Sequence, residues 1–142
     1  MKILVVNGVN INMTGAREPI YGNESLDSIN ARLKAYTEAR GGKIEFFQSN
    51  IEGEIVDRLQ RGGFDGLVIN PGAYAHYSYA IADALCICKA KKVEVHLSNI
   101  LAREQFRQVS VTARGCDGCI IGLGADSYFA AVEYLLWQSK KS

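Results

Sequence analysis

Arg17 and Tyr21 stand four residues apart, between the first apolar run of the chain and its first helical pattern. A tyrosine is a poor base at neutral pH because its side-chain pKa is about 10. A guanidinium within a few ångströms stabilises the negative phenolate, so the two residues together could remove a proton from a carbon next to a ketone. The same pair could instead be a surface arginine and a tyrosine that packs in the core.

His96 directly follows the apolar run Val93-Glu94-Val95 and is one of two histidines in the chain. An imidazole at the end of a buried strand could donate a proton to a departing hydroxyl. Ser98, with the backbone N–H groups that follow the strand, could hold a carboxylate. The alternative is a histidine whose hydrogen bonds are satisfied by neighbouring carbonyl groups.

His76 opens a segment with helical spacing, and Asp83 follows seven residues later. Residues seven apart lie on the same face of a helix, two turns on. The two side chains could bind hydroxyl groups or orient other residues of a site, but each alone favours a structural role.

The four cysteines do not form a complete metal-binding pattern. Cys116 and Cys119 have the spacing of a redox motif or of half a zinc site, but a zinc site needs a coherent second pair. Cys86 and Cys88 lie two residues apart in a helical segment, on different faces. We expect buried, reduced thiols and no metal ion; a redox function of Cys116 and Cys119 would require thiols of low pKa.

Five short apolar runs have the character of buried parallel strands, because they are rich in β-branched residues and bounded by polar or glycine residues. They are Ile3–Val6, Ile44–Phe47, Leu67–Ile69, Val93–Val95 and Cys119–Ile121. Helical patterns separate them, which predicts a parallel sheet covered on both faces. We therefore expect an α/β fold in a single domain spanning residues 1–142.

The helical patterns have recognisable starts and stops. Ser25 is a candidate N-cap for the first, and Gly41-Gly42 a candidate stop. The apolar positions on one face of the first helix are Leu26, Ile29, Leu33 and Tyr36, and those of the second are Ile51, Ile55 and Leu59, before Gly62-Gly63. Two further helices are expected at residues 80–89 and 128–136, and a shorter one at residues 103–106.

The polar candidates follow strands whose carboxyl ends meet at one edge of the predicted sheet. In open α/β sheets a ligand binds outside those ends, near the point where the strand order reverses. Asn7, Gly8 and Asn10 follow the first strand, Asn70-Pro71-Gly72 the third, and His96 the fourth. The connection over residues 8–24 is long enough to be a lid or a binding loop.

Composition excludes several classes of function. The chain has 142 residues, a net charge of +1, 48% hydrophobic and 22% charged residues, so nothing favours nucleic acid as a partner. No apolar stretch approaches the roughly 20 residues of a membrane span. Four cysteines in a chain without an export signal favour the reducing cytoplasm. Walker and GxSxG sequences are absent.

Blocks along essentially the whole chain resemble the type II 3-dehydroquinate dehydratase family, in the expected order and spacing. These blocks are Asn7–Asn12, Arg17–Pro19, Tyr21–Gly22, Gln48–Asn50, Glu52–Glu54, Asn70–Ala73, His76–Ser78, Glu94–Asn99, Ala102–Glu104, Phe106–Arg107 and Gly122–Gly124. The resemblance implies a flavodoxin-like three-layer sandwich with a five-stranded parallel sheet, and a homododecamer built from trimers. It also implies an anti elimination of water from 3-dehydroquinate through an enolate, giving 3-dehydroshikimate without a metal or a cofactor. The reaction would serve the shikimate pathway to aromatic amino acids or quinate catabolism.

The resemblance further implies a role for each matched catalytic residue. Tyr21 would be the base and Arg17 would hold it as phenolate. Asn10 would lie near an ordered water that stabilises the enolate, and His96 would be the acid. Substrate-binding roles are implied for six more residues: Asn70, His76 and Arg107 on ring hydroxyls, Leu97 and Ser98 on the carboxylate, and Asp83 from a neighbouring subunit.

The chain departs from the family pattern in a shortened loop and at four single positions, Val9, Thr14, Ala75 and Ala82. Only Ile20 separates Pro19 from Tyr21, where the family has two residues, so this loop is shorter by one residue. Ala82 stands beside Asp83 where an arginine is frequent. A non-catalytic domain that holds a phosphate-bearing ligand at the same edge is the rival interpretation, but it would need a glycine- or hydroxyl-rich loop after the first strand.

Overall fold

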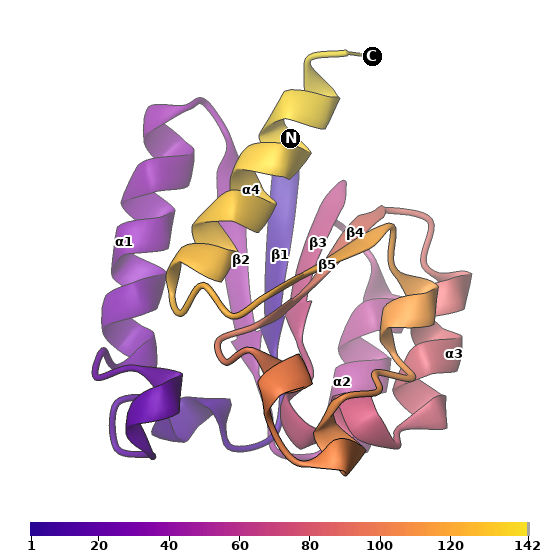
Figure 1. Ribbon diagram of the computed structural model, residues 1–142. Helices are drawn as coiled ribbons and strands as arrows, with labels where there is room; N and C mark the ends of the chain where they lie inside the picture. The colour runs from indigo at the N-terminus through magenta and orange to yellow at the C-terminus, as the bar shows by residue number, and fades with distance from the viewer. Residues whose placement is uncertain (142) are drawn as a thin grey trace.

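A five-stranded parallel sheet forms the centre of the computed structural model, which describes residues 1–141 (Figure 1). Its strands are β1 Lys2–Asn7, β2 Lys43–Gln48, β3 Gly66–Asn70, β4 Lys91–His96 and β5 Gly118–Ile121. All neighbouring pairs are parallel, in the order β2-β1-β3-β4-β5. This is the order of flavodoxin-like sheets. The predicted fold class and all five predicted strands are confirmed, each within two residues at either end.

Helices cover both faces of the sheet, because successive residues of a strand point to opposite sides. The helices are α1 Leu26–Ala39, α2 Glu52–Arg61, α3 Tyr79–Ile87 and α4 Asp126–Ser139. Ile3 and Val5 of β1 pack in the core that includes α1 and α4, while Leu4 and Val6 pack in the core that includes α2 and α3 (Figure 1). The three layers are thus helices, sheet and helices. No helix among the described residues is long and apolar enough to cross a membrane.

The predicted helix boundaries hold where a cap was recognised. The Ser25 hydroxyl accepts a hydrogen bond from the Ser28 N–H at 3.2 Å and so begins α1. Gly62, with φ of 66°, ends α2. Ile51, however, was wrongly placed on the buried face of that helix. It precedes the helix as its N-cap residue and is 60% exposed, whereas Ile55 and Leu59 are buried as expected.

The predicted short helix at residues 103–106 is wrong. Two separate 3₁₀ turns, Ile100–Ala102 and Gln105–Arg107, flank an extended backbone at Arg103 and Glu104. Most helical stability in proteins comes from burying an apolar face, and Phe106 is 58% exposed. With so little apolar surface to bury, the segment does not build a continuous helix.

Candidate active site

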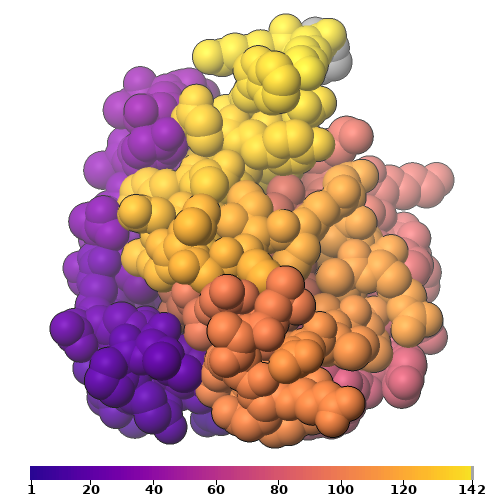
Figure 2. Space-filling view, in the orientation of Figure 1, coloured from indigo at the N-terminus to yellow at the C-terminus, as the bar shows by residue number. Residues whose placement is uncertain are grey.

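One cavity lies at the carboxyl ends of β1, β3 and β4, and nine of the ten predicted site residues line it. They are Asn10, Arg17, Tyr21, Asn70, His76, His96, Leu97, Ser98 and Arg107. Figure 2 shows the early loop (indigo) and the segment after β4 (orange) meeting along the lower edge of the molecule. The expected convergence of polar residues at this edge is therefore observed.

Two glycines allow the loops after β1 and β3 to touch. The Gly8 N–H donates to the Asn70 carbonyl at 2.7 Å, and a Cβ atom on Gly8 would lie 2.2 Å from the Pro71 carbonyl oxygen. A Cβ atom on Gly72, where φ is +65°, would lie 2.4 Å from the Val9 carbonyl oxygen. No larger residue fits this backbone approach, which brings the loop carrying Asn10 against the end of β3.

Two arginines lie over the ring of Tyr21. Its side chain is buried, and the 3₁₀ turn Pro19–Tyr21 carries it into the cavity despite the missing loop residue. The Arg17 guanidinium carbon is 3.8 Å from the centre of the ring, and that of Arg103 is 4.9 Å from it. The sequence assigned no role to Arg103; its position in the block Ala102–Glu104 was the available signal.

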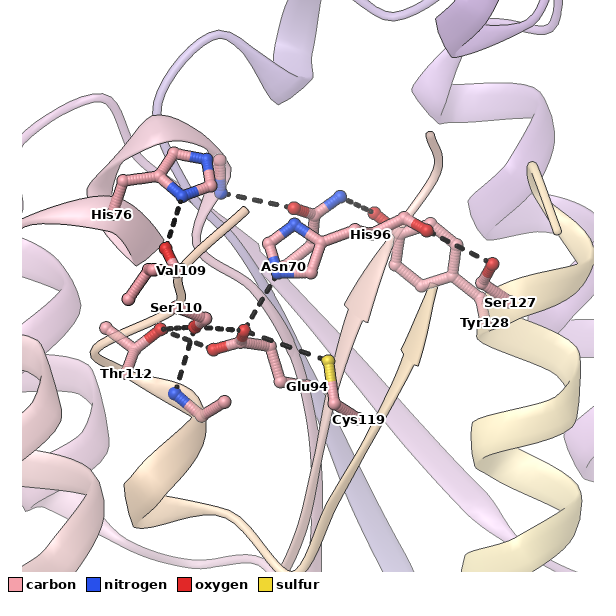
Figure 3. A network of polar contacts seen from close by, with 12 residues as sticks. Asn70, His76, Glu94, His96, Val109, Ser110, Thr112, Cys119, Ser127 and Tyr128 are labelled. Atoms are coloured by element: carbon pink, nitrogen blue, oxygen red, sulfur yellow. Dashed lines mark hydrogen bonds and ion pairs between the residues drawn. The ribbon is translucent and has the colours of Figure 1, made fainter. Parts of the chain in front are cut away.

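His96 is paired with a buried carboxylate. Its Nε2 atom lies 2.8 Å from Oε2 of Glu94, and Glu94 is completely buried (Figure 3). The two residues stand two apart on β4 and so share a face of the sheet. Glu94 was not predicted as a site residue, although an acidic residue inside an apolar strand is itself a signal.

Other polar groups fix the Glu94 carboxylate. The Ser110 hydroxyl donates to Oε2 at 2.6 Å and the Thr112 hydroxyl donates to Oε1 (Figure 3). These donors compensate the burial of a negative charge and hold its orientation. His96 is therefore hydrogen-bonded to a carboxylate held in a fixed orientation, and not to backbone carbonyl groups.

His76 faces the same cavity in a defined tautomer. Its Nδ1 atom lies 2.9 Å from the Val109 carbonyl, which can only accept, so Nδ1 carries the proton. Burial lowers the pKa of His76, the hydrogen bond to Val109 opposes this, and the His96 and Arg107 charges lower it further. His76 is thus neutral at pH 7, with its ring stacked at 6.2 Å from that of His96.

Asn70 is held by a buried chain of hydrogen bonds. Its side-chain N–H donates to the Tyr128 hydroxyl at 3.0 Å, and its side-chain oxygen accepts from the Gly72 N–H at 3.1 Å (Figure 3). The Tyr128 hydroxyl donates in turn to Asn7 at 2.5 Å. Burial raises the pKa of Tyr128, so this hydroxyl stays protonated and acts as a donor. One end of α4 thereby fixes the ends of both β1 and β3.

The charge of the cavity wall is positive. Arg17, Arg103 and Arg107 line it, and within residues 1–141 no acidic side chain does. Arg103 donates to the Ser98 hydroxyl at 3.2 Å, and Arg107 donates to Glu104 at 2.6 Å outside the cavity. Such a wall suits a small anionic molecule that carries hydroxyl groups.

Asp83 is the predicted site residue that does not line this cavity. It lies on α3 and is exposed. In a single chain it is therefore a surface residue, and the expected contribution from a neighbouring subunit stays a prediction.

The expectation of buried cysteines is wrong, although all four thiols are free. Cys86 and Cys119 are exposed, and Cys88 and Cys116 are intermediate. Cys119 is exposed because β5 is an edge strand of the sheet. Partial burial and the charge of Glu94 raise the pKa of Cys119 to about 12 and also raise that of Cys116, whereas a redox pair needs a thiol of low pKa.

Ligand atoms of Glu94, His96 and Cys119 lie within 4.8 Å of one another, so these three could hold a metal ion.

Comparison with known proteins agrees with this geometry. The model of the family described as dehydroquinase class II matches residues 1–136. A 3-dehydroquinate dehydratase from Thermotoga neapolitana is 57% identical over 143 residues, covering 100% of this chain and 99% of that protein. The crystal structure of a type II dehydroquinase from Butyrivibrio crossotus matches with a TM-score of 0.93 and 48% identity, over 95% of this chain and 97% of that one. The type II dehydroquinase from Propionibacterium acnes gives a TM-score of 0.92 at 42% identity, over 96% of each chain. With the fold, the cavity and a match over nearly its whole length, the chain belongs to the dehydroquinase class II family.

Proposed function

We propose that this chain is a 3-dehydroquinate dehydratase, a hydro-lyase that converts 3-dehydroquinate to 3-dehydroshikimate and water without a metal or an organic cofactor. The relatives named for this activity and the family membership support the assignment. The observation that carries the chemistry is that Tyr21, against two guanidinium groups, and His96, against a buried carboxylate, line the same cavity.

The elimination begins at Tyr21. The guanidinium groups of Arg17 and Arg103 lie over its ring. Held by Arg17 as the phenolate, Tyr21 takes a proton from C2 of the substrate, next to the ketone. The electron pair of that C–H bond moves into an enolate, whose oxygen is stabilised by a water molecule held near Asn10. Collapse of the enolate forms the C1–C2 double bond and expels the C1 hydroxyl on the opposite face.

His96 supplies the proton that turns the leaving hydroxyl into water. Its Nε2–H is directed at Glu94, which leaves Nδ1 as the ring atom that exchanges a proton with the substrate. Glu94 stabilises the positively charged ring before transfer and keeps it oriented. One proton enters at Tyr21 and one leaves at His96, so the cycle closes when solvent returns both groups to their starting states.

The remaining cavity residues orient the substrate. Asn70, His76 and Arg107 bind ring hydroxyls. The N–H groups of Leu97 and Ser98, with the Ser98 hydroxyl that Arg103 holds, bind the carboxylate. The positive wall favours an anionic substrate over a neutral one.

Residues 1–142 act as one catalytic domain, and we propose a homo-oligomer, a dodecamer of trimers, in which Asp83 of one subunit completes the site of another. The exposure of Asp83 on α3 supports this arrangement. The four free thiols support a cytoplasmic location. The pathway is the shikimate route to aromatic amino acids or quinate catabolism.

The direct test mixes purified protein with 3-dehydroquinate and follows the ultraviolet absorbance of the conjugated enone product. We expect steady formation of the enone, with the same rate after exhaustive treatment with EDTA. No enone from the wild-type protein would contradict the proposed activity. Loss of turnover with EDTA that a divalent ion restores would contradict the metal-free mechanism.

A further inference from the structure

Strand register brings a thiol next to the His96–Glu94 pair. Glu94 of β4 is paired with Cys119 of the edge strand β5, and His96 follows two residues after Glu94 on the same face. The Cys119 sulfur is 4.0 Å from Oε2 of Glu94, and Oε2 is 2.8 Å from Nε2 of His96. A thiol, a carboxylate and an imidazole thus converge, with their ligand atoms within 4.8 Å of one another.

We propose that Glu94, His96 and Cys119 form a binding site for a zinc-class divalent cation, and that occupation of this site inhibits the enzyme. Sulfur, nitrogen and oxygen ligands of this kind are those that Zn²⁺ and Co²⁺ accept, and three protein ligands leave the fourth tetrahedral position to water.

The ligand atoms must move by about an ångström to surround a tetrahedral cation. With metal–nitrogen and metal–oxygen distances of about 2.1 Å and a metal–sulfur distance of about 2.3 Å, tetrahedral ligand atoms lie about 3.4 to 3.6 Å apart. The His96–Glu94 distance of 2.8 Å would grow by about 0.6 Å, and the Cys119–Glu94 distance of 4.0 Å would shrink by about 0.4 Å. The Cys119–His96 pair, whose ligand atoms lie within 4.8 Å, would close by up to about 1.2 Å. Side-chain rotation of Cys119, on an edge strand, can supply much of this change.

The surroundings favour ligation by Glu94 in particular. Ser110 and Thr112 donate to its carboxylate and keep it oriented toward the imidazole while a cation replaces the proton between them. Cys119 is exposed, and His96 lines the cavity, so the site can be reached from solvent. Because the thiol must lose its proton to bind, the affinity for the cation should rise with pH.

Occupation of this site would remove the acid of the reaction, and this consequence rests on the proposed function. A cation on Nε2 of His96 takes the place of the proton that Glu94 accepts. The neutral ring keeps its proton at Nδ1 when a metal binds Nε2, but transfer of that proton would leave an imidazolate instead of a neutral imidazole. The ring is then a much weaker acid, so protonation of the leaving hydroxyl is strongly slowed. The protein would then need no metal for activity and yet lose activity when one binds.

Binding is tested first by spectroscopy, which needs no turnover. Titration of the wild-type protein with Co²⁺ should give a thiolate-to-cobalt charge-transfer band that Zn²⁺ abolishes. The band should be absent from Cys119→Ala and retained in Cys86→Ala, a matched control because Cys86 is also exposed and free but lies outside the group. No band in the wild type, or an undiminished band in Cys119→Ala, would overturn the site.

Inhibition is tested second, with the enone assay in the presence of free Zn²⁺. We expect inhibition that EDTA reverses, and a concentration for half inhibition that is about tenfold or more higher for Cys119→Ala than for the wild type or Cys86→Ala. Equal sensitivity of the three proteins would overturn the inhibitory role. A cobalt band in a protein that makes no enone would instead refute the proposed dehydratase while the cation site stands.

Discussion

Oε2 of Glu94 lies 2.8 Å from Nε2 of His96, and neither side chain is more than slightly exposed. The strand period of two places both on one face of β4, and the hydroxyls of Ser110 and Thr112 hold the carboxylate in place. Proton exchange at the imidazole therefore takes place beside a carboxylate whose orientation is fixed.

Glu94→Gln tests that coupling. Glutamine keeps the shape and removes the charge, so the positively charged ring loses its stabilisation and kcat should fall by about a hundredfold with little change in KM. The measurement is the enone assay over a range of pH. Glu38→Gln, in an exposed ion pair on α1, is the control and should behave as wild type. An unchanged kcat in Glu94→Gln would show that His96 acts without its partner.

Tyr21→Phe tests the base. The ring still packs against Arg17 and Arg103, but the proton acceptor is gone, so kcat should fall by at least about a hundredfold while substrate still binds. Tyr36→Phe is the matched control, because its hydroxyl bonds Glu133 at 2.6 Å and does not line the cavity. Retention of more than about a tenth of wild-type kcat by Tyr21→Phe would rule out Tyr21 as the base.

The lowered pKa of His76 predicts a pH dependence of stability. Below pH 6.5, the ordinary pKa, His76 binds a proton more readily in the unfolded chain than in the folded protein. Its contribution to the free energy of unfolding is therefore complete above that pH and is lost as the pH falls. The unfolding temperature of the wild type should therefore fall further on acidification than that of His76→Asn. Parallel shifts of the two proteins would contradict the assignment.

Gly8→Ala tests the contact between the two loops. The new methyl group would lie 2.2 Å from the Pro71 carbonyl oxygen, so the backbone must move, at a cost of about 1 to 3 kcal/mol or more. Activity should fall with stability, because the moved loop carries Asn10. Gly53→Ala is the control: a methyl group there would have nothing within 4 Å, and alanine in α2 should stabilise the protein by up to about 1 kcal/mol. Thermal unfolding and the enone assay on both variants are the measurements.

Asp83→Ala tests the shared site. If the carboxylate acts across an interface, kcat/KM should fall while the thermal stability of the assembly changes little, since Asp83 is exposed within its own chain. Sedimentation and light scattering should show a large homo-oligomer, a dodecamer or at least a trimer. An active wild-type monomer at micromolar concentration would exclude a site completed by a second subunit.

The elements that sequence predicted well are those whose signals are local. The strands follow directly from their β-branched runs, and α1 from the Ser25 cap, because each depends on neighbouring residues. Ile51 was misplaced because the apolar spacing of a helix does not show where the helix begins. The helix expected at residues 103–106 failed because the pattern could not reveal how little of that segment the core covers.

The sequence predicted which residues form the site better than it predicted how those residues contact one another. Convergence at the carboxyl edge follows from parallel topology, so Asn10, Asn70 and His96 could be grouped in advance. The contacts of Glu94 with Ser110 and Thr112 could not, since they depend on the path of an irregular segment sixteen or more residues further on. Cys119 was expected to be buried, but nothing in its apolar run indicates that the strand lies at the edge of the sheet.

The stacking of His76 on His96 has a practical consequence. The chain holds two histidines, and both line one cavity with their ring centres 6.2 Å apart. Every imidazole signal, whether from an isotope label or from an acylating reagent, therefore originates in the same few ångströms, with no background from elsewhere in the subunit. A histidine-selective label thus reports ligand occupancy in this protein without any engineered probe.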